Sequence, residues 1–272
     1  MRIFLTAILL VATNMLYGQV TIQNVDFTQK GDKIQIKYDI KGQEKTYLDV
    51  YYSLNDGSTW HGPVNHVSGD VKDVRPETGK QITWHVLKER DWLITENLKI
   101  KIKGQPKEGT FTDSRDGQTY KWVRIGNQVW MAENLNYDAG SGCWCYDDNS
   151  SNCDQYGRLY NWETAKKACP DGWHLPSKSE FETLLKRYGG EGEQAYTALI
   201  RGGSSDFSAL FSGRRYGDGL FYGLGDNGYF WSSSEDNSKG AWRLDVYGGY
   251  SRKAGIYCGG RSVGRSVRCV KD

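Results

Sequence analysis

The 272-residue chain has almost no net charge and, after its first residues, no long hydrophobic run. Its 35 Lys and Arg residues against 33 Asp and Glu residues give a formal net charge of +2, so the whole chain has no electrostatic attraction to nucleic acid or an anionic membrane. No segment beyond residue 18 is long and apolar enough to cross a bilayer. We therefore expect no nucleic-acid partner and no membrane span.

Catalytic and metal-binding motifs are also missing. The chain contains no Gly-x-Ser-x-Gly elbow, no phosphate-binding glycine loop and no paired-histidine metal motif. Cys143 and Cys145 have the wrong spacing for a zinc site, and no histidine follows at finger distance. His174 lies between apolar residues at a helix entrance, which favours a structural role. We expect no enzyme, no bound metal and no cofactor.

The first residues have the pattern of a secretory signal peptide. Arg2 precedes the apolar run Ile3–Ala12, and the small residue Gly18 stands before Gln19. The run is shorter than the roughly 20 residues of a membrane helix. No cysteine lies near Gln19, so a lipid anchor is not indicated. We predict a signal peptide at residues 1–18 and an exported protein that is extracellular, on the cell surface or in the periplasm.

Residues 19–104 alternate between apolar and polar side chains. Ile34, Ile36, Tyr38 and Ile40 are separated by polar residues, which places them on one face of a strand. The same period appears at 48–52, 82–86 and 98–102, with turn-rich sequences between. This pattern predicts an all-β sandwich, which resembles the immunoglobulin-like modules that precede ligand-binding domains in exported proteins. A spacer role is expected for it.

A short polar segment with Gly and Pro, 103–110, predicts a boundary, and a second domain follows at 105–272. One helix is predicted within 157–170, with Trp162 and Cys169 on one face and Pro170 as its stop. Another is predicted within 176–190, where Ser177 and Glu180 form a capping box. From 191 onward we expect loops with isolated strands at 229–234, 241–247 and 266–271.

Two long stretches of the second half are characteristic, 110–137 and 145–185, together with "FWSSSE" (230–235) and "SVRCV" (266–270). In these stretches the sequence resembles the Fibrobacter succinogenes major paralogous domain over about 107–272. The resemblance implies an α+β, C-type-lectin-like fold with two helices and a small twisted antiparallel sheet whose first and last strands meet. The expected fold class is therefore mixed, and the resemblance implies binding rather than catalysis.

All six cysteines lie in the second half, where export would allow disulfides, and six cysteines permit 15 pairings. The resemblance implies a disulfide between Cys169 and Cys269 that links the first helix to the last strand. Cys145 and Cys153 bracket a tight loop that a disulfide closes easily. Cys143 and Cys258 remain, either as a third disulfide, which we favour, or with a free thiol.

The resemblance carries no calcium-dependent sugar site, because the motifs Glu-Pro-Asn, Gln-Pro-Asp and Trp-Asn-Asp do not occur. The acidic run 147–154 lacks the Gly and distal Glu of an EF-hand loop, which favours a solvated turn. The formylglycine-generating family, a catalytic relative by fold, uses a reactive cysteine pair near its C-terminus. Cys258 and Cys269 echo that pair only superficially, because the resemblance implies Cys169 as the structural partner of Cys269.

The C-terminal stretch is rich in Tyr, Arg, Ser and Gly, the composition of antibody binding surfaces. Between Leu244 and Ser266, Lys253 is the only residue among Lys, Glu, Gln, Trp and Met. Diversity-generating retroelements, which rewrite such domains, cannot create these five types from their usual codons. We predict a diversified binding surface on loops at 247–265 for a protein or glycan ligand; the alternative is a structural part of an envelope or extracellular assembly. The predicted ligand-facing residues are Tyr247, Tyr250, Arg252, Tyr257, Arg261 and Arg265, with Tyr222, Asp226 and Asn227 nearby.

Overall fold

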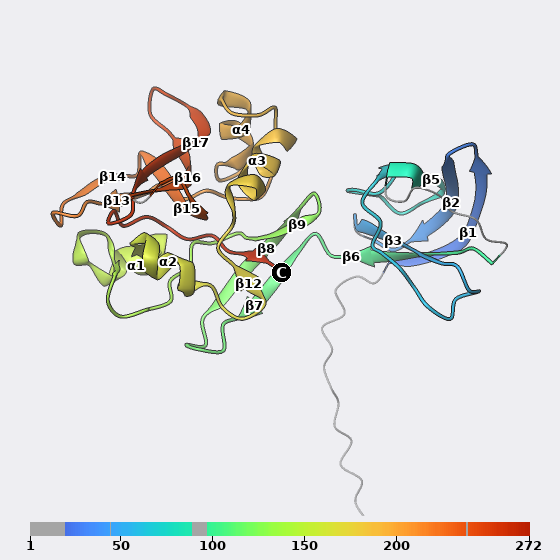
Figure 1. The fold of residues 1–272 in the computed structure, drawn as a ribbon, viewed down its shortest axis with the longest axis horizontal. Helices are drawn as coiled ribbons and strands as arrows, with labels where there is room; N and C mark the ends of the chain where they lie inside the picture. The colour runs from blue at the N-terminus through green and yellow to red at the C-terminus, as the bar shows by residue number, and fades with distance from the viewer. Residues whose placement is uncertain (1–19, 44, 89–96, 238) are drawn as a thin grey trace, which may run out of the picture. The chain divides into compact units, whose positions relative to one another are not determined.

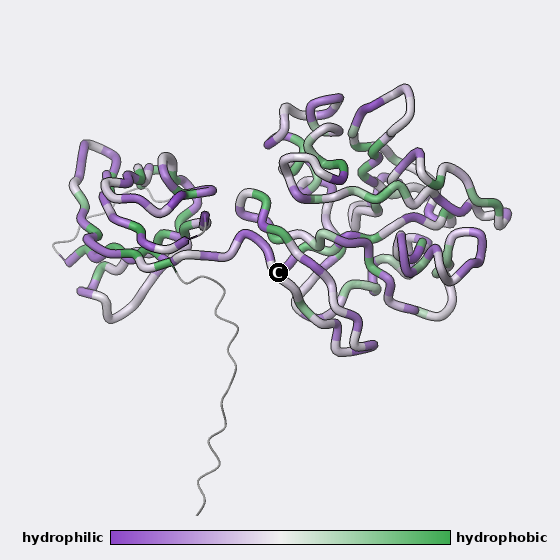
Figure 2. The backbone as a smooth tube through the Cα atoms, turned by 180° about the vertical axis from the view of Figure 1, so that it is seen from behind, coloured by the Kyte–Doolittle hydropathy of each residue, from purple (hydrophilic) through white to green (hydrophobic). Residues whose placement is uncertain are grey.

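The computed structural model describes residues 20–43, 45–88, 97–237 and 239–272 (Figure 1). The chain forms two compact units, Met1–Lys107 and Glu108–Asp272. The predicted signal peptide lies outside the described residues. Within them, hydropathy changes every few residues (Figure 2), and no helix is long and apolar enough to cross a membrane.

The first unit contains two antiparallel sheets. One has the order β1-β2-β5-β4, with β1 at Thr21–Lys30, β2 at Lys33–Lys41, β4 at Val67–Gly69 and β5 at Glu77–His85. The other pairs β3 (Tyr47–Ser53) with β6 (Lys99–Gln105), and a 3-10 turn, Val86–Lys88, follows β5. Alternate residues of β2, from Ile34 to Ile40, are buried. They share one core with residues of β3, β5 and β6, as the alternation predicts.

The second unit is built around two larger antiparallel sheets. The five-stranded sheet has the order β12-β18-β9-β8-β7: β7 is Glu108–Thr112, β8 Thr119–Ile125, β9 Gln128–Met131, β12 Trp173–His174 and β18 Val270–Lys271. The first and last strands of the unit therefore lie in one sheet, which anchors the C-terminus. The three-stranded sheet contains β15 (Asn227–Glu235), β16 (Gly240–Tyr247) and β17 (Lys253–Gly260) in that order.

Two short two-stranded sheets complete the strands of this unit. β10 (Cys143–Trp144) pairs with β11 (Leu159–Tyr160), and β13 (Ser212–Arg215) pairs with β14 (Phe221–Leu224). A 3-10 turn, Tyr146–Asp148, follows β10.

Both predicted helices are present. α2 (Trp162–Ala168) begins at Asn161, whose side chain accepts a hydrogen bond from the Thr164 amide, and it ends before Pro170. α3 (Lys178–Arg187) begins with the predicted capping box, in which Ser177 and Glu180 each bind the other's backbone amide.

The expected number of helices is wrong, because the described part of the second unit contains four. α1 (Ser150–Tyr156) forms within the acidic run 147–154 and just beyond it, where the sequence favours a solvated turn. α4 (Glu193–Leu199) forms in a region predicted to be loop. Each is only seven residues long, too short for a clear helical period in the sequence. The mixed class is confirmed at the level of strands, helices and small antiparallel sheets.

The C-terminal stretch is a core segment, contrary to its surface-like composition. Every residue from Val263 to Val270 is buried, and Val267 and Cys269 belong to the cluster around Trp162 and Trp231. A second cluster joins α3 and α4 to the apolar face of the β15-β16-β17 sheet. The exposed residues of the C-terminal region therefore lie before residue 263 or after Val270.

Candidate functional site

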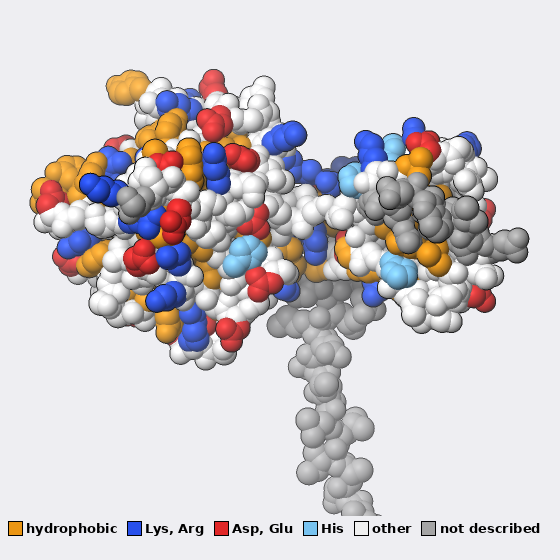
Figure 3. All heavy atoms as spheres, in the orientation of Figure 1, with side chains coloured by type: hydrophobic (Ala, Val, Ile, Leu, Met, Phe, Trp, Pro, Cys, Tyr) orange, Lys and Arg blue, Asp and Glu red, His pale blue; other side chains and the backbone are white. Residues whose placement is uncertain are grey.

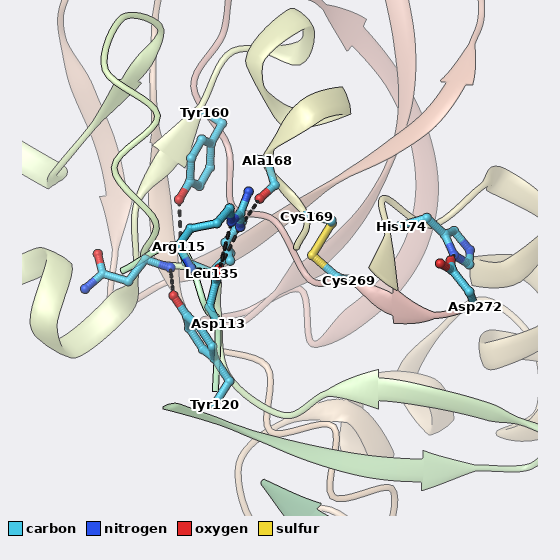
Figure 4. Close-up of a disulfide and its surroundings, with 11 residues drawn as sticks. Asp113, Arg115, Tyr120, Leu135, Tyr160, Ala168, Cys169, His174, Cys269 and Asp272 are labelled. Atoms are coloured by element: carbon cyan, nitrogen blue, oxygen red, sulfur yellow. Dashed lines mark hydrogen bonds and ion pairs between the residues drawn. A yellow bond between two sulfur atoms is a disulfide. The ribbon is translucent and has the colours of Figure 1, made fainter. Parts of the chain in front are cut away.

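Two disulfides hold the second unit together, and both are the predicted ones. Cys169, at the end of α2, bonds to Cys269 just before β18, with 5.9 Å between the Cα atoms and 100 residues between them in sequence (Figure 4). Cys145 bonds to Cys153 across eight residues. The first of these fixes the C-terminal segment against the helix that precedes Pro170.

The third disulfide that we favoured does not form, because Cys143 and Cys258 are both free. Cys143 is buried, and its thiol donates to the Gly140 carbonyl oxygen at 3.3 Å. Burial raises the pKa of Cys143, so its thiol resists ionisation. Cys258 is exposed on β17.

Polar contacts reinforce the region of the Cys169–Cys269 disulfide (Figure 4). Arg115 pairs with the fully buried carboxylate of Asp113 at 2.6 Å and donates to the Ala168 carbonyl oxygen. His174 lies between two carboxylates, with Nε2 at 2.9 Å from Glu180 and Nδ1 at 2.7 Å from Asp272. These contacts link α2, α3 and the last residue of the chain. The structural interpretation of His174 is consistent with this geometry.

Arg268 is a buried crosslink that the sequence does not reveal. Its side chain is 0% exposed, and it donates to Asn134 Oδ1 at 2.7 Å, to the Met131 and Ser208 carbonyl oxygens and to that of Phe207. Its guanidinium therefore joins the C-terminal segment to two distant loops.

The three-stranded sheet has one apolar and one polar face, as the alternation in 241–247 predicts. Leu244 and Val246 pack into the helix-side core. On the other face, Arg243 holds the buried Asp245 through two hydrogen bonds of 2.8 and 2.9 Å, and Tyr247 donates to the same carboxylate at 2.7 Å. Burial raises the pKa of Asp245 despite the opposing charge of Arg243. Opposite charges two residues apart in a strand could have indicated this pair.

Two further arginines lie close to that polar face. The Arg265 guanidinium is 4.1 Å from the Trp231 ring centroid, and that of Arg214 is 4.9 Å from the Tyr229 ring centroid. The Nε atoms of both arginines are buried without a hydrogen-bond partner. Arg214, Tyr229 and Arg243 are not among the site residues that the sequence predicts. The face thus has several guanidinium groups and a single buried carboxylate.

Four predicted ligand-facing residues gather on the β16–β17 hairpin. Tyr250 and Arg252 are exposed in its turn, and Tyr250 is fully exposed. Tyr247 and Tyr257 are half-buried on neighbouring strands, with ring centroids 5.8 Å apart. The predicted loops at 247–265 are in part a regular strand, because Lys253–Gly260 forms β17.

The other predicted residues do not join this group. Arg265, which the sequence predicts to face a ligand, is only 3% exposed. Arg261 is half-buried and donates to Glu235 at 3.0 Å and to the Gly240 carbonyl oxygen at 3.2 Å, so it braces the sheet. Tyr222 is exposed on β14 beside Tyr216, while Asp226 and Asn227 lie at the start of β15.

The acidic side chains of the described run 147–154 do not gather into a metal-binding cluster. Among the described residues, no group of three or more His, Cys, Asp or Glu side chains could hold a metal ion. The space-filling view shows Lys, Arg, Asp and Glu side chains mixed over the visible face of the second unit (Figure 3).

Comparison with known proteins identifies the second unit. Residues 123–271, more than half of the chain, match the Fibrobacter succinogenes major domain. No curated protein and no solved structure matches the chain significantly. The chain belongs to the Fibrobacter succinogenes major domain family.

Proposed function

We propose that this protein is an exported ligand-binding protein whose recognition surface is the β16–β17 hairpin. In this proposal the first unit is an immunoglobulin-like spacer and the second a C-type-lectin-like binding domain without catalytic activity. Two disulfides support export, because such bonds persist mainly outside the cytosol.

The observation that carries the proposal is the placement of Tyr250 and Arg252. Both side chains are exposed at a hairpin turn, and among the described residues neither has a side-chain hydrogen bond, ion pair or ring contact. Tyr and Arg are the residue types that dominate binding hot spots. The strands beneath the turn are held by a packed core, so the turn is presented on a rigid base.

Diversification by a retroelement belongs to the same proposal. The buried segment 263–266 and the core residues Leu244 and Val246 would not tolerate free variation. The exposed positions 249–253, 260 and 262 would. The neighbouring DNA should then contain an adenine-rich near-copy of the coding region for 240–270 and a reverse transcriptase gene. Without them, diversification is withdrawn while binding stands.

The test of binding is a screen of the secreted protein against glycan and cell-surface protein arrays. We expect Tyr250→Ser and Arg252→Ser to lower binding to the array ligand at least about tenfold, a hot-spot effect. Their melting temperatures should stay unchanged, because neither side chain packs against the fold. Arg201→Ser, which removes an exposed arginine from the turn after α4, is the matched control. Unchanged binding by both hairpin variants would refute the proposal.

A further inference from the structure

The outer edge of β17 is only partly paired. β17 follows β16 at one end of its sheet, and alternate residues of an antiparallel strand direct their N–H and C=O groups to the same side. Ala254 pairs with Gly192 through both groups: its carbonyl oxygen accepts from the Gly192 N–H at 2.8 Å, and its N–H donates to the Gly192 carbonyl oxygen at 3.0 Å. The outer edge therefore continues through Ile256, Cys258 and Gly260.

The backbone groups along this edge are not equally occupied. Ile256 donates its N–H to Glu191 Oε1 at 3.1 Å. The Cys258 carbonyl oxygen accepts from Arg243 Nη1, and the Gly260 carbonyl oxygen accepts from Arg265 Nη1 at 3.1 Å. Along the described chain, the N–H groups of Cys258 and Gly260 have no partner. At Cys258 and Gly260 the edge therefore has free N–H donors, while the carbonyl oxygens accept hydrogen bonds from arginines.

The same two arginines bring positive charge to the edge. A Cβ atom on Gly259 would meet Arg243 Nη1 and lie 2.9 Å from Arg265 Nη2, so the missing side chain makes room for both guanidinium groups. Burial and the neighbouring Arg243 lower the pKa of Arg265 to about 9, which leaves it charged at neutral pH. Lys253 adds a third cation beside Tyr257.

Fewer negative than positive side chains lie near the edge, and the carboxylates there already have hydrogen-bond partners. Asp245 is paired with Arg243, and Glu191 accepts from the Ile256 amide. The Nε atom of Arg265 is buried without a partner, although the whole residue is only 3% exposed. A desolvated donor without an acceptor is destabilising, and an anionic group nearby would offset the surrounding positive charge.

We propose that β17 binds an extended acidic peptide by strand addition. The peptide backbone pairs with the free N–H groups of Cys258 and Gly260. Its acidic side chains are attracted by the charges of Arg243 and Arg265, which are buried beside Gly259 at 8% and 3% exposure. This inference rests on the proposed binding function and names its ligand class. It requires Cys258 and Gly260 to be accessible, and both are exposed.

Strand geometry favours a peptide over an acidic glycan. The outward groups of Cys258 and Gly260 repeat every second residue, which matches the backbone carbonyls of another strand. The side chains of an added strand would alternate between the arginine face and the face of Ile256 and Cys258. The best peptide therefore alternates acidic with apolar residues.

The test measures binding of three fluorescent probes to the full chain by anisotropy. The first is a heptapeptide that alternates glutamate with valine, the second replaces each glutamate with lysine, and the third is an oligomer of glucuronic acid. We expect the glutamate peptide to bind at least about tenfold tighter than either other probe, and to weaken as salt rises.

One substitution separates backbone pairing from side-chain effects. Cys258→Pro removes the outward N–H but keeps the contacts with β16, because Pro is tolerated where an edge N–H faces solvent. Cys258→Val removes the thiol and keeps the N–H. We expect the proline variant to lose at least about tenfold in affinity for the glutamate peptide and the valine variant to stay within about twofold. Circular dichroism spectra and melting temperatures check that both variants fold.

Three results would overturn the inference. They are equal binding of the glutamate and lysine peptides, tightest binding of the glucuronic acid oligomer, and equal affinity of the proline and valine variants when both are folded. If the array ligand still depends on Tyr250 and Arg252 while the peptide fails, strand addition is wrong and the proposed function stands. If the hairpin variants bind the array ligand normally, the proposed function itself is wrong.

Discussion

Removing the Cys169–Cys269 disulfide should destabilise the second unit more than any other change to its cysteines. The bond closes a loop of 100 residues, whereas Cys145–Cys153 closes eight. The chain-entropy relation assigns about 4.7 kcal/mol to the first loop and about 2.5 kcal/mol to the second. The difference of about 2 kcal/mol arises in the unfolded chain, because the longer crosslink restricts it more.

The assays are urea unfolding and thermal unfolding of the double variants Cys169→Ala/Cys269→Ala and Cys145→Ala/Cys153→Ala under non-reducing conditions. At about 2–4 °C per kcal/mol for a domain of this size, melting temperatures should fall by about 10–20 °C and 5–10 °C. Cys258→Ala, which removes an exposed free thiol, is the control and should change stability by less than about 0.5 kcal/mol. An equal or smaller loss for the Cys169 pair would refute the reasoning.

Three further predictions concern groups that the structure places in unusual surroundings. Maleimide should label Cys258 in the folded protein and Cys143 only after unfolding, because Cys143 is buried with a raised pKa; mass mapping of the labelled peptides decides this. Arg268→Met should cost about 3 kcal/mol or more in urea unfolding, because four oxygen acceptors, including Asn134 Oδ1, would lose their buried donor; a loss below about 1 kcal/mol would contradict its role as a crosslink. Desolvation lowers the pKa of His174, but hydrogen bonds to Glu180 and Asp272 outweigh it and leave the pKa raised above 6.5. A raised folded pKa adds stability that is complete below the unfolded pKa and is lost as pH rises through the folded value. Stability should therefore begin to decline as pH rises past about 6.5 and fall further through the raised folded pKa, and His174→Asn should remove this decline.

Local sequence signals predicted those parts of the fold that depend on neighbouring residues. The alternation around Ile36 and the capping box at Ser177 and Glu180 both correspond to observed elements. These signals work because a strand face or a helix start is determined within a few residues. α4 escaped prediction because seven residues show too little periodicity.

The buried C-terminal segment could not be predicted by the same means. Arg and Ser are mostly exposed in proteins, so a run containing Arg265, Ser266 and Arg268 has the composition of a surface. Here Arg268 donates to carbonyl oxygens that lie 60 or more residues away in sequence, at Phe207 among others. Such partners exist only once the chain has folded.

In the candidate site, too, sequence could predict features that depend on neighbouring residues but not contacts between distant ones. Composition predicts Tyr250 and Arg252 to face a ligand, and both are exposed in the hairpin turn. It missed the approach of Arg243 and Arg265 to the open edge of β17, which depends on the pairing of β16 with β17 and on the missing side chain of Gly259.

The most direct test of the β16–β17 hairpin as the recognition surface is amide hydrogen exchange with and without the array ligand. Binding at the hairpin predicts that protection increases within 247–260 and stays unchanged at α1 and in the first unit. Protection that appears only outside 247–260 would contradict the account.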